Sequence, residues 1–219
     1  MHKDNNYEEE YHLNRHSNLY NDSEYYFARA RIALRLFFKG IKKSSKILEY
    51  GCGLGQNICL MKNINAIGYD TSKFALDFCK KKGVRTVSKL KDLDKYGEFD
   101  VVLSCEVLEH LENPLMALEE MNSQLKKGGK LILILPIDKW NKPKIDDDNQ
   151  HLYNWNFNTI TNLLVRAGFY PVHYNIIKAT GFKRLLWASR ISFELYFFLT
   201  KLAAIISGSK HMKIIAIKK

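Results

Sequence analysis

Three closely spaced glycines follow a short apolar stretch in the segment KILEYGCGLG, which spans residues 46–55. Gly51, Gly53 and Gly55 can adopt positive φ without strain, and they let a ligand approach the backbone closely. Amides that begin a helix after such a turn would face the ligand with partial positive charge. Glu49 precedes the turn, and a carboxylate there favours a ligand with positive charge, such as an aminoacyl group, over a pyrophosphate.

Asp70 is the second candidate for ligand binding, because it ends the next apolar stretch, residues 66–70. In nucleotide sites with a strand, a glycine turn and a helix, an acid at this place accepts hydrogen bonds from ribose hydroxyls. The third glycine of the dinucleotide pattern G-x-G-x-x-G is absent here. The spacing therefore predicts a site for an aminoacyl nucleoside, and a helix cap for residues 72–82 is a second role open to Asp70.

His110 and His151 are the best candidates for a general base by residue type, since imidazole titrates near neutral pH. His110 follows Glu106 and Glu109 in the run EVLEH, and His151 ends a polar stretch, residues 138–151, that we expect to form a surface loop. A purely structural turn is the alternative interpretation of EVLEH.

The elements that must position these residues alternate between apolar strands and helices. We expect strands near 46–49, 66–70, 85–87, 100–104, 130–136, 170–177 and 212–218, and helices over 56–62, 72–82, 113–127 and 156–167. Strands that are apolar throughout and separated by helices indicate a parallel sheet that is covered on both faces.

Two segments lie outside this alternation. Residues 1–22 show no hydrophobic period and are expected to form a mobile arm, followed by a helix that Ser23 caps and Gly40 ends. Residues 182–207 are expected to form one apolar helix, on which Lys183, Arg190, Glu194 and Lys201 would share a sector of roughly 40°. This helix would lie in a membrane interface, at a dimer or partner surface, or within the fold, but its charges argue against a spanning helix.

The composition limits the function classes. The 219 residues suffice for one domain with an appended element, and the formal charge of +11 favours nucleic acid, an anionic membrane surface or phosphorylated metabolites, or else a lysine-rich surface. The four cysteines form no C-x-x-C pair and the first residues are polar, so we expect reduced thiols in a cytoplasmic protein without a cleavable signal peptide.

Six motifs together resemble the class I S-adenosylmethionine-dependent methyltransferases, in particular the small-molecule O-methyltransferases of the ubiquinone-biosynthesis type. They are EYGCGLG at 49–55, GYD at 68–70, FDVV at 99–102, EVLEHL at 106–111, LKKGG at 125–129 and AGF at 167–169. The resemblance implies a Rossmann-like α/β sandwich of three layers, with a seven-stranded, mostly parallel sheet and an antiparallel last strand. An N-terminal arm and helix (1–45) would precede the methyltransferase domain (46–219), with the apolar helical insertion at about 182–207.

The same resemblance assigns cofactor contacts to matching positions. The methionine part of S-adenosylmethionine would lie on Glu49, Tyr50, Gly51, Cys52, Gly53 and Gly55, the ribose on Asp70 and Thr71, and the adenine near Lys89 and Leu90. Many family members have an acid near Lys89, so the adenine contact departs from their pattern. Cys105 and Glu106 would line the floor beneath the methyl group.

A metal site is a further implication. Two glutamates and two histidines bind a divalent metal in the similar small-RNA 3′-end 2′-O-methyltransferases, and Glu106, Glu109, His110 and His151 would be the matching ligands.

We therefore predict a methyltransferase that acts on a hydroxyl of a small molecule, a glycan or a lipid-linked metabolite, in the cytoplasm or peripherally on the inner face of the membrane. An RNA methyltransferase of the metal-assisted 2′-O type is the first alternative, although the chain has no recognisable RNA-binding module. A non-catalytic, cofactor-binding partner subunit is the second, and residues 182–207 would then bind its partner or form a homodimer.

Overall fold

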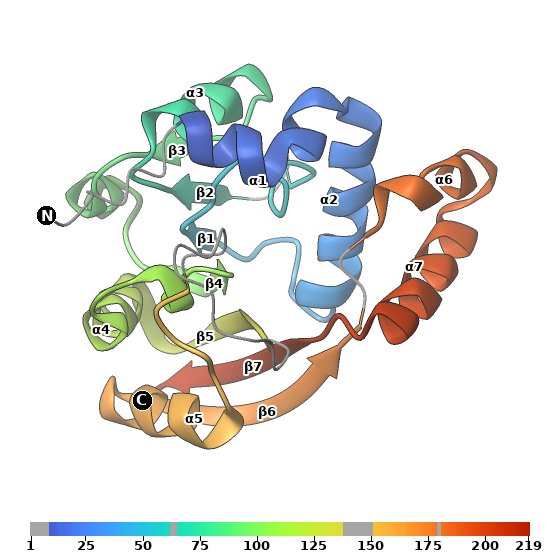
Figure 1. Ribbon diagram of the computed structural model, residues 1–219. Helices are drawn as coiled ribbons and strands as arrows, with labels where there is room; N and C mark the ends of the chain where they lie inside the picture. Colours follow the sequence, from blue (N-terminus) through green and yellow to red (C-terminus); the bar gives the residue numbers. More distant parts are fainter. Residues whose placement is uncertain (1–8, 62–64, 138–150, 179–180) are drawn as a thin grey trace, which may run out of the picture.

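A seven-stranded sheet forms the centre of the protein, with the strand order β3-β2-β1-β4-β5-β7-β6 (Figure 1). The computed structural model describes residues 9–61, 65–137, 151–178 and 181–219. The strands are β1 (Ile47–Tyr50), β2 (Ala66–Tyr69), β3 (Thr86–Val87), β4 (Phe99–Cys105), β5 (Leu125–Pro136), β6 (Phe169–Ile177) and β7 (His211–Lys218). Strand β7 pairs antiparallel with both β5 and β6, whereas the other neighbouring strands pair in parallel. The predicted α/β fold with an antiparallel last strand is confirmed.

Helices cover both faces of this sheet, and α1 and α3 lie above β2 and β3 in Figure 1. They are α1 (Glu9–Asn21), α2 (Ser23–Phe37), α3 (Lys73–Lys81), α4 (Pro114–Gln124), α5 (Phe157–Arg166), α6 (Trp187–Ile191) and α7 (Phe193–Ser207), with short 3-10 turns η1 (Leu90–Tyr96), η2 (Leu108–His110) and η3 (Lys183–Leu185). None of the described helices is long and apolar enough to cross a bilayer.

The core has two layers because successive strand residues point to opposite faces. Ile47 of β1 packs in the cluster that contains α2, α3, α6 and α7, whereas Leu48 packs in the cluster that contains α4 and α5. Strand β5 alternates in the same way, with Ile132 in the first cluster and Leu133 in the second. This alternation explains why central strands of the parallel sheet are apolar throughout.

Three predictions about the segments before residue 130 differ from the structure. Residues 9–21 form helix α1 rather than a mobile arm, although His16 has non-helical dihedrals. Gln56 to Leu60 form hydrogen-bonded turns rather than a helix. The helix from residue 113 ends at Gln124, and β5 already starts at Leu125, so the pair Gly128–Gly129 lies within a strand.

Helix α2 begins at Ser23, where a helix was predicted, but Asp22 rather than Ser23 is its cap and accepts a hydrogen bond from the Tyr25 N–H at 3.0 Å. The fully buried Tyr26 donates from its hydroxyl to the Leu54 carbonyl at 2.9 Å. This contact fixes the glycine turn against α2.

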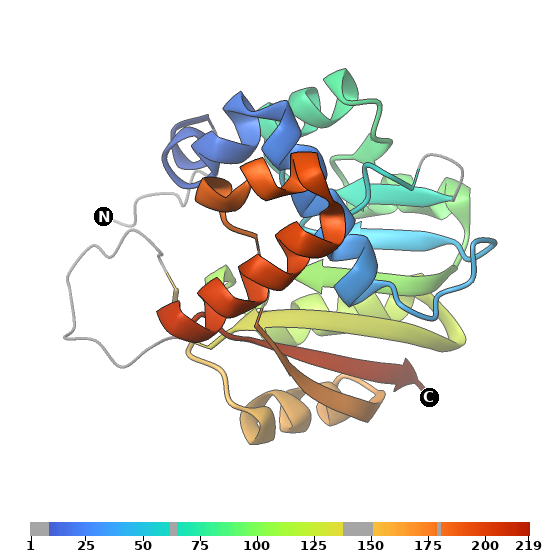
Figure 2. The same cartoon turned by 90° about the vertical axis from the view of Figure 1, so that its right-hand side faces the viewer.

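The segment 182–207 is not one helix. Ser192 is extended and ends α6, and its hydroxyl caps α7 by accepting from the Leu195 N–H at 3.1 Å. The resulting α6–α7 hairpin lies beside α2 in both views (Figures 1 and 2). The predicted loop at 138–151 lies outside the described residues except for His151.

Candidate cofactor and acceptor site

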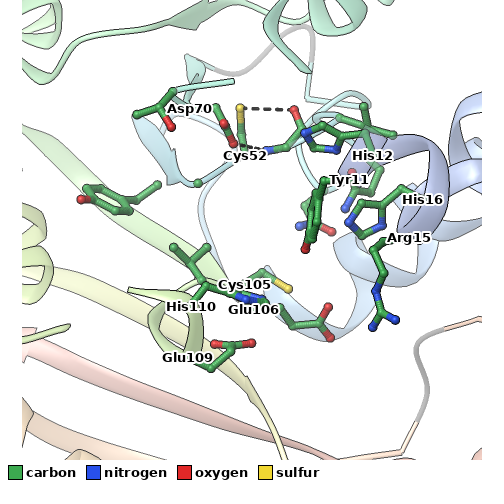
Figure 3. Close-up of a pocket in the computed structure, with 18 of the residues that line it drawn as sticks. Tyr11, His12, Arg15, His16, Cys52, Asp70, Cys105, Glu106, Glu109 and His110 are labelled. Atoms are coloured by element: carbon green, nitrogen blue, oxygen red, sulfur yellow. Dashed lines mark hydrogen bonds between the residues drawn. The ribbon is translucent and has the colours of Figure 1, made fainter. Parts of the chain in front are cut away.

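A cavity of about 540 Å³ lies at the carboxyl ends of β1, β2 and β4, where α1 borders it (Figure 3). Most of the predicted site residues line it, namely Tyr50, Gly51, Cys52, Gly53, Asp70, Thr71, Cys105, Glu106, Glu109, His110 and His151. Four predicted cofactor residues are not among the lining residues, namely Glu49, Gly55, Lys89 and Leu90. Lys89 and Leu90 start the turn η1, and Leu90 packs against the core cluster beneath α4 and α5.

The glycine turn has the shape of a ligand cradle. Gly51, Gly53 and Gly55 have φ of 73°, 48° and 71°, which L-residues with side chains rarely adopt. A Cβ on Gly51 would lie 2.5 Å from a methyl of Val107, and one on Gly55 would lie 2.8 Å from the sulfur of Cys79. At Gly53 the nearest atom would be a His12 ring carbon at 4.0 Å, so this glycine opens toward the cavity.

Asp70 holds this turn in place. One carboxylate oxygen accepts from the Gly53 N–H at 2.7 Å, and the other accepts from the Ser72 N–H at 2.9 Å. Ser72 itself caps α3, because its hydroxyl accepts from the Ala75 N–H at 3.2 Å. Asp70 therefore connects the turn to the start of α3 and also faces the cavity.

Glu49 supports the turn from within the protein. Its side chain is fully buried, and one oxygen accepts from the Asn57 side-chain amide at 2.6 Å. Burial raises the pKa of Glu49 to about 8, an effect that the Asn57 hydrogen bond only partly offsets. Asn57 lines the cavity, so Glu49 is connected to the cavity through that amide.

Glu106 forms an ion pair with His211, a residue that was not predicted to belong to the site. Its backbone has φ of 57°, and its carboxylate accepts from the His211 Nε2 at 2.6 Å. Burial by itself would raise the pKa of Glu106, but the hydrogen bond and charge of His211, with Arg29 and His16, lower it to about 2. The side chain is 40% exposed toward the cavity, so solvent weakens this ion pair.

Glu109, His110 and His151 form the polar cluster at the other side of the cavity. Their potential ligand atoms lie within 4.8 Å of one another, and the two imidazole centroids are 4.9 Å apart. The Leu152 N–H donates to the Glu109 carbonyl at 2.7 Å, which places His151 beside η2. One oxygen and two imidazole nitrogens suit zinc or another divalent transition metal. Glu106 is not part of this group, so the predicted four-ligand set is reduced to three.

Helix α1 contributes residues that we had not predicted. Tyr11, His12, Arg15 and His16 line the cavity (Figure 3). His12 also stacks on Phe74, with ring centroids 5.7 Å apart. Burial, and then the charges of His12, Arg29 and Arg15, lower the pKa of His16 to about 4, while Glu106 opposes them. The spacing i, i+1, i+4 and i+5 places these four residues on one helical face, which is a signal present in the sequence.

The chain is similar in sequence to known methyltransferases. The sequence matches the family described as "Methyltransferase domain" over residues 15–187. It is 30% identical over 149 residues to the tRNA (carboxymethyluridine(34)-5-O)-methyltransferase alkbh8 of Xenopus tropicalis, a match that covers 64% of this chain and 24% of that protein. It is 32% identical over 101 residues to the tRNA U34 carboxymethyltransferase of Mannheimia succiniciproducens, covering 40% of this chain and 31% of that protein. The chain thus spans only about a quarter to a third of these relatives.

A solved structure shows the same fold. The 1,6-didemethyltoxoflavin-N1-methyltransferase of Burkholderia thailandensis, which contains S-adenosylhomocysteine, superposes with a TM-score of 0.61 at 17% identity. The match covers 95% of this chain and 84% of that one.

Proposed function

Because this chain belongs to the S-adenosylmethionine-dependent methyltransferases, we propose that it methylates an oxygen of an acceptor held between α1 and the cluster of Glu109, His110 and His151. The observation that carries the proposal is the pair of imidazoles in the same cavity as the glycine turn and Asp70. Methyl transfer to a hydroxyl needs a group that removes the hydroxyl proton, and a neutral imidazole suits that role.

S-adenosylmethionine supplies an electrophilic methyl group when it is bound. The residues that line the cavity suit this cofactor. The open face of Gly53 and the carboxylate of Asp70 would hold its aminoacyl and ribose parts at one end of the cavity. His110 follows β4 in the turn η2, and both histidines line the same cavity as Cys105. In this arrangement α1 excludes water and orients the acceptor, while an imidazole takes its proton.

A divalent metal on Glu109, His110 and His151 is the second way in which this cluster can activate a hydroxyl, since a bound cation lowers the pKa of its ligand. The imidazole-base mechanism and the metal mechanism predict different responses to a chelator. Dialysis against a chelator should leave activity unchanged if an imidazole is the base, and should abolish it if a metal is required. Binding of Zn²⁺ or Mn²⁺ to the enzyme, and its loss in Glu109→Gln, would be measured independently by calorimetry.

The decisive experiment is a screen of hydroxyl, amine and carboxylate acceptors by release of S-adenosylhomocysteine. On the acceptor found, His110→Gln or His151→Gln should lower kcat about 10²-fold or more, with little change in cofactor affinity. His173→Gln is the matched control, because His173 is exposed on β6. Unchanged turnover in both cavity variants would refute the proposed role of the histidines.

RNA is the second candidate acceptor, supported by the names of the curated relatives and by the charge of +11. An RNA substrate predicts retention of tRNA at low salt and a steep loss of affinity as salt rises. Equal binding of tRNA and a neutral polymer would end this alternative.

A further inference from the structure

The α6–α7 hairpin has an unusual outer face, on which large apolar side chains are exposed. They are Trp187 at 53%, Ile191 at 68%, Phe198 at 57%, Leu202 at 41%, Ile205 at 57% and Ile206 at 86%. At about 100° per residue, the four residues on α7 occupy a sector of roughly 100°, so they form one stripe. Figure 2 shows both helices in front of the rest of the chain, with no described element covering them. We call these six residues the apolar outer face.

Three charged residues in and beside the hairpin are directed toward α2 rather than toward this face. Arg190 pairs with Glu24 at 2.8 Å, and Glu194 pairs with Arg35 at 2.5 Å, both across the boundary with α2. Lys183 lies 3.4 Å from Asp22, the cap of α2. Three of the four charges expected to share one stripe are thus directed at α2 or its cap, whereas Lys201 is exposed.

Exposed basic residues lie close in the sequence to the apolar outer face. Arg184, Lys201 and Lys210 are exposed on or next to the two helices, and the Lys201 ammonium lies 4.8 Å from the Phe197 ring centroid. A second copy of this basic chain would bring like charges together, whereas an anionic lipid surface would complement them. Aromatic and aliphatic side chains bordered by Lys and Arg are typical of helices that lie in a membrane interface.

We propose that the α6–α7 hairpin binds the surface of an anionic membrane, with the apolar outer face inserted between headgroups. Helix α7 has 15 residues, or about 22 Å, too short for a hydrocarbon core of about 30 Å, so it lies in the plane of the interface. It ends four residues before His211, which pairs with Glu106 in the cavity. Bound in this way, the enzyme holds its cavity near the membrane, where an amphipathic acceptor would be concentrated.

Vesicle flotation tests this proposal. The full chain should float with vesicles of phosphatidylcholine and phosphatidylglycerol in equal amounts, and much less with phosphatidylcholine alone. Phe198→Glu and Ile206→Glu should each reduce flotation about tenfold. Val165→Glu should float like the wild type, because Val165 is similarly exposed, at 50%, but lies on α5.

Tryptophan fluorescence gives a second readout on unaltered protein. The chain has three tryptophans, of which Trp140 lies outside the described residues. Trp187 is exposed and Trp155 is 4% exposed, so insertion should shift the emission of Trp187 to shorter wavelength, and Trp187→Phe should remove that shift. Absence of flotation by the wild type, or equal flotation by the Ile206→Glu and Val165→Glu variants, would overturn the proposal. Dimerisation by sedimentation velocity that Ile206→Glu abolishes, without vesicle binding, would instead identify a second copy as the occupant.

Discussion

Four acids at one end of the sheet occupy four different environments. Asp70 accepts two backbone hydrogen bonds, Glu106 pairs with His211, and Glu109 lies with two imidazoles. Glu49 and Glu109 are both fully buried, but Glu49 accepts from an amide side chain, and burial is the main reason why its pKa is raised. All four side chains are carboxylic acids, so the sequence alone cannot tell which of them supports the turn and which faces the cavity. In the fold, burial and the nearest partner distinguish them.

Glu49→Gln tests the burial of this acid through the pH dependence of stability. The pKa of Glu49 is about 8 in the folded protein and 4.5 as the ordinary value, so the folded state binds the extra proton between these values. Its contribution to stability is therefore complete below pH 4.5 and is lost as pH rises through about 8. Glutamine resembles the protonated acid, so the variant should lack this loss.

The measurement is the free energy of unfolding of the cofactor-free protein at several pH values. His16, with its lowered pKa, changes stability in the opposite direction, from about 4 to 6.5, but does so in wild type and variant alike. The informative quantity is consequently the difference between the two proteins. Glu98→Gln, at an exposed position, is the control, and parallel pH profiles of wild type and Glu49→Gln would contradict the prediction.

At the scale of elements, α1 shows why an absent hydrophobic period does not exclude a helix. Its inner face consists of tyrosine, histidine and arginine because it covers a polar cavity, and only His12 and Leu19 are buried. In the α6–α7 hairpin, by contrast, a continuous apolar pattern predicted one helix where the structure has two. Its apolar residues continue across Ser192, so the sequence resembles one helix, although a serine cap interrupts it.

We expect α1 to contribute to cofactor binding. The double variant Tyr11→Ala/His12→Ala should weaken S-adenosylmethionine binding about fivefold to tenfold by calorimetry, because both side chains close the cavity over the glycine turn. Asn14→Ala and Asn18→Ala on the exposed side of the same helix should bind normally. Equal affinities in all these variants would show that α1 does not participate.

At the scale of the whole molecule, α2 connects the elements that build the site. It holds the glycine turn through Tyr26, the α6–α7 hairpin through Glu24 and Arg35, and the last strand through Lys213. Lys213 is 8% exposed, and its ammonium donates to the carbonyls of Leu36 at 2.6 Å and Phe37 at 3.2 Å. These carbonyls end α2, where a cation is favourable.

Lys213→Met should destabilise the protein by about 2 kcal/mol, because it keeps the apolar stem but leaves two helix-terminal carbonyls without their donor. Chemical denaturation would measure the loss. Lys210→Met is the matched control at an exposed site three residues earlier, and it should change stability little. A similar loss in both variants would argue against the role of the buried ammonium.

The sequence by itself determined the strand pattern, the glycine turn with Asp70 after it, the family and hence the cofactor, because these features depend on local periods and short spacings. Only the tertiary structure decided that α1 covers the cavity, that His151 meets His110, and that Glu106 pairs with His211 instead of joining them. Glu106 and His211 come together because β7 inserts between β5 and β6, and no local pattern contains that placement. No local pattern contains the placement of the hairpin beside α2 either, where Arg190 and Glu194 pair with residues of α2.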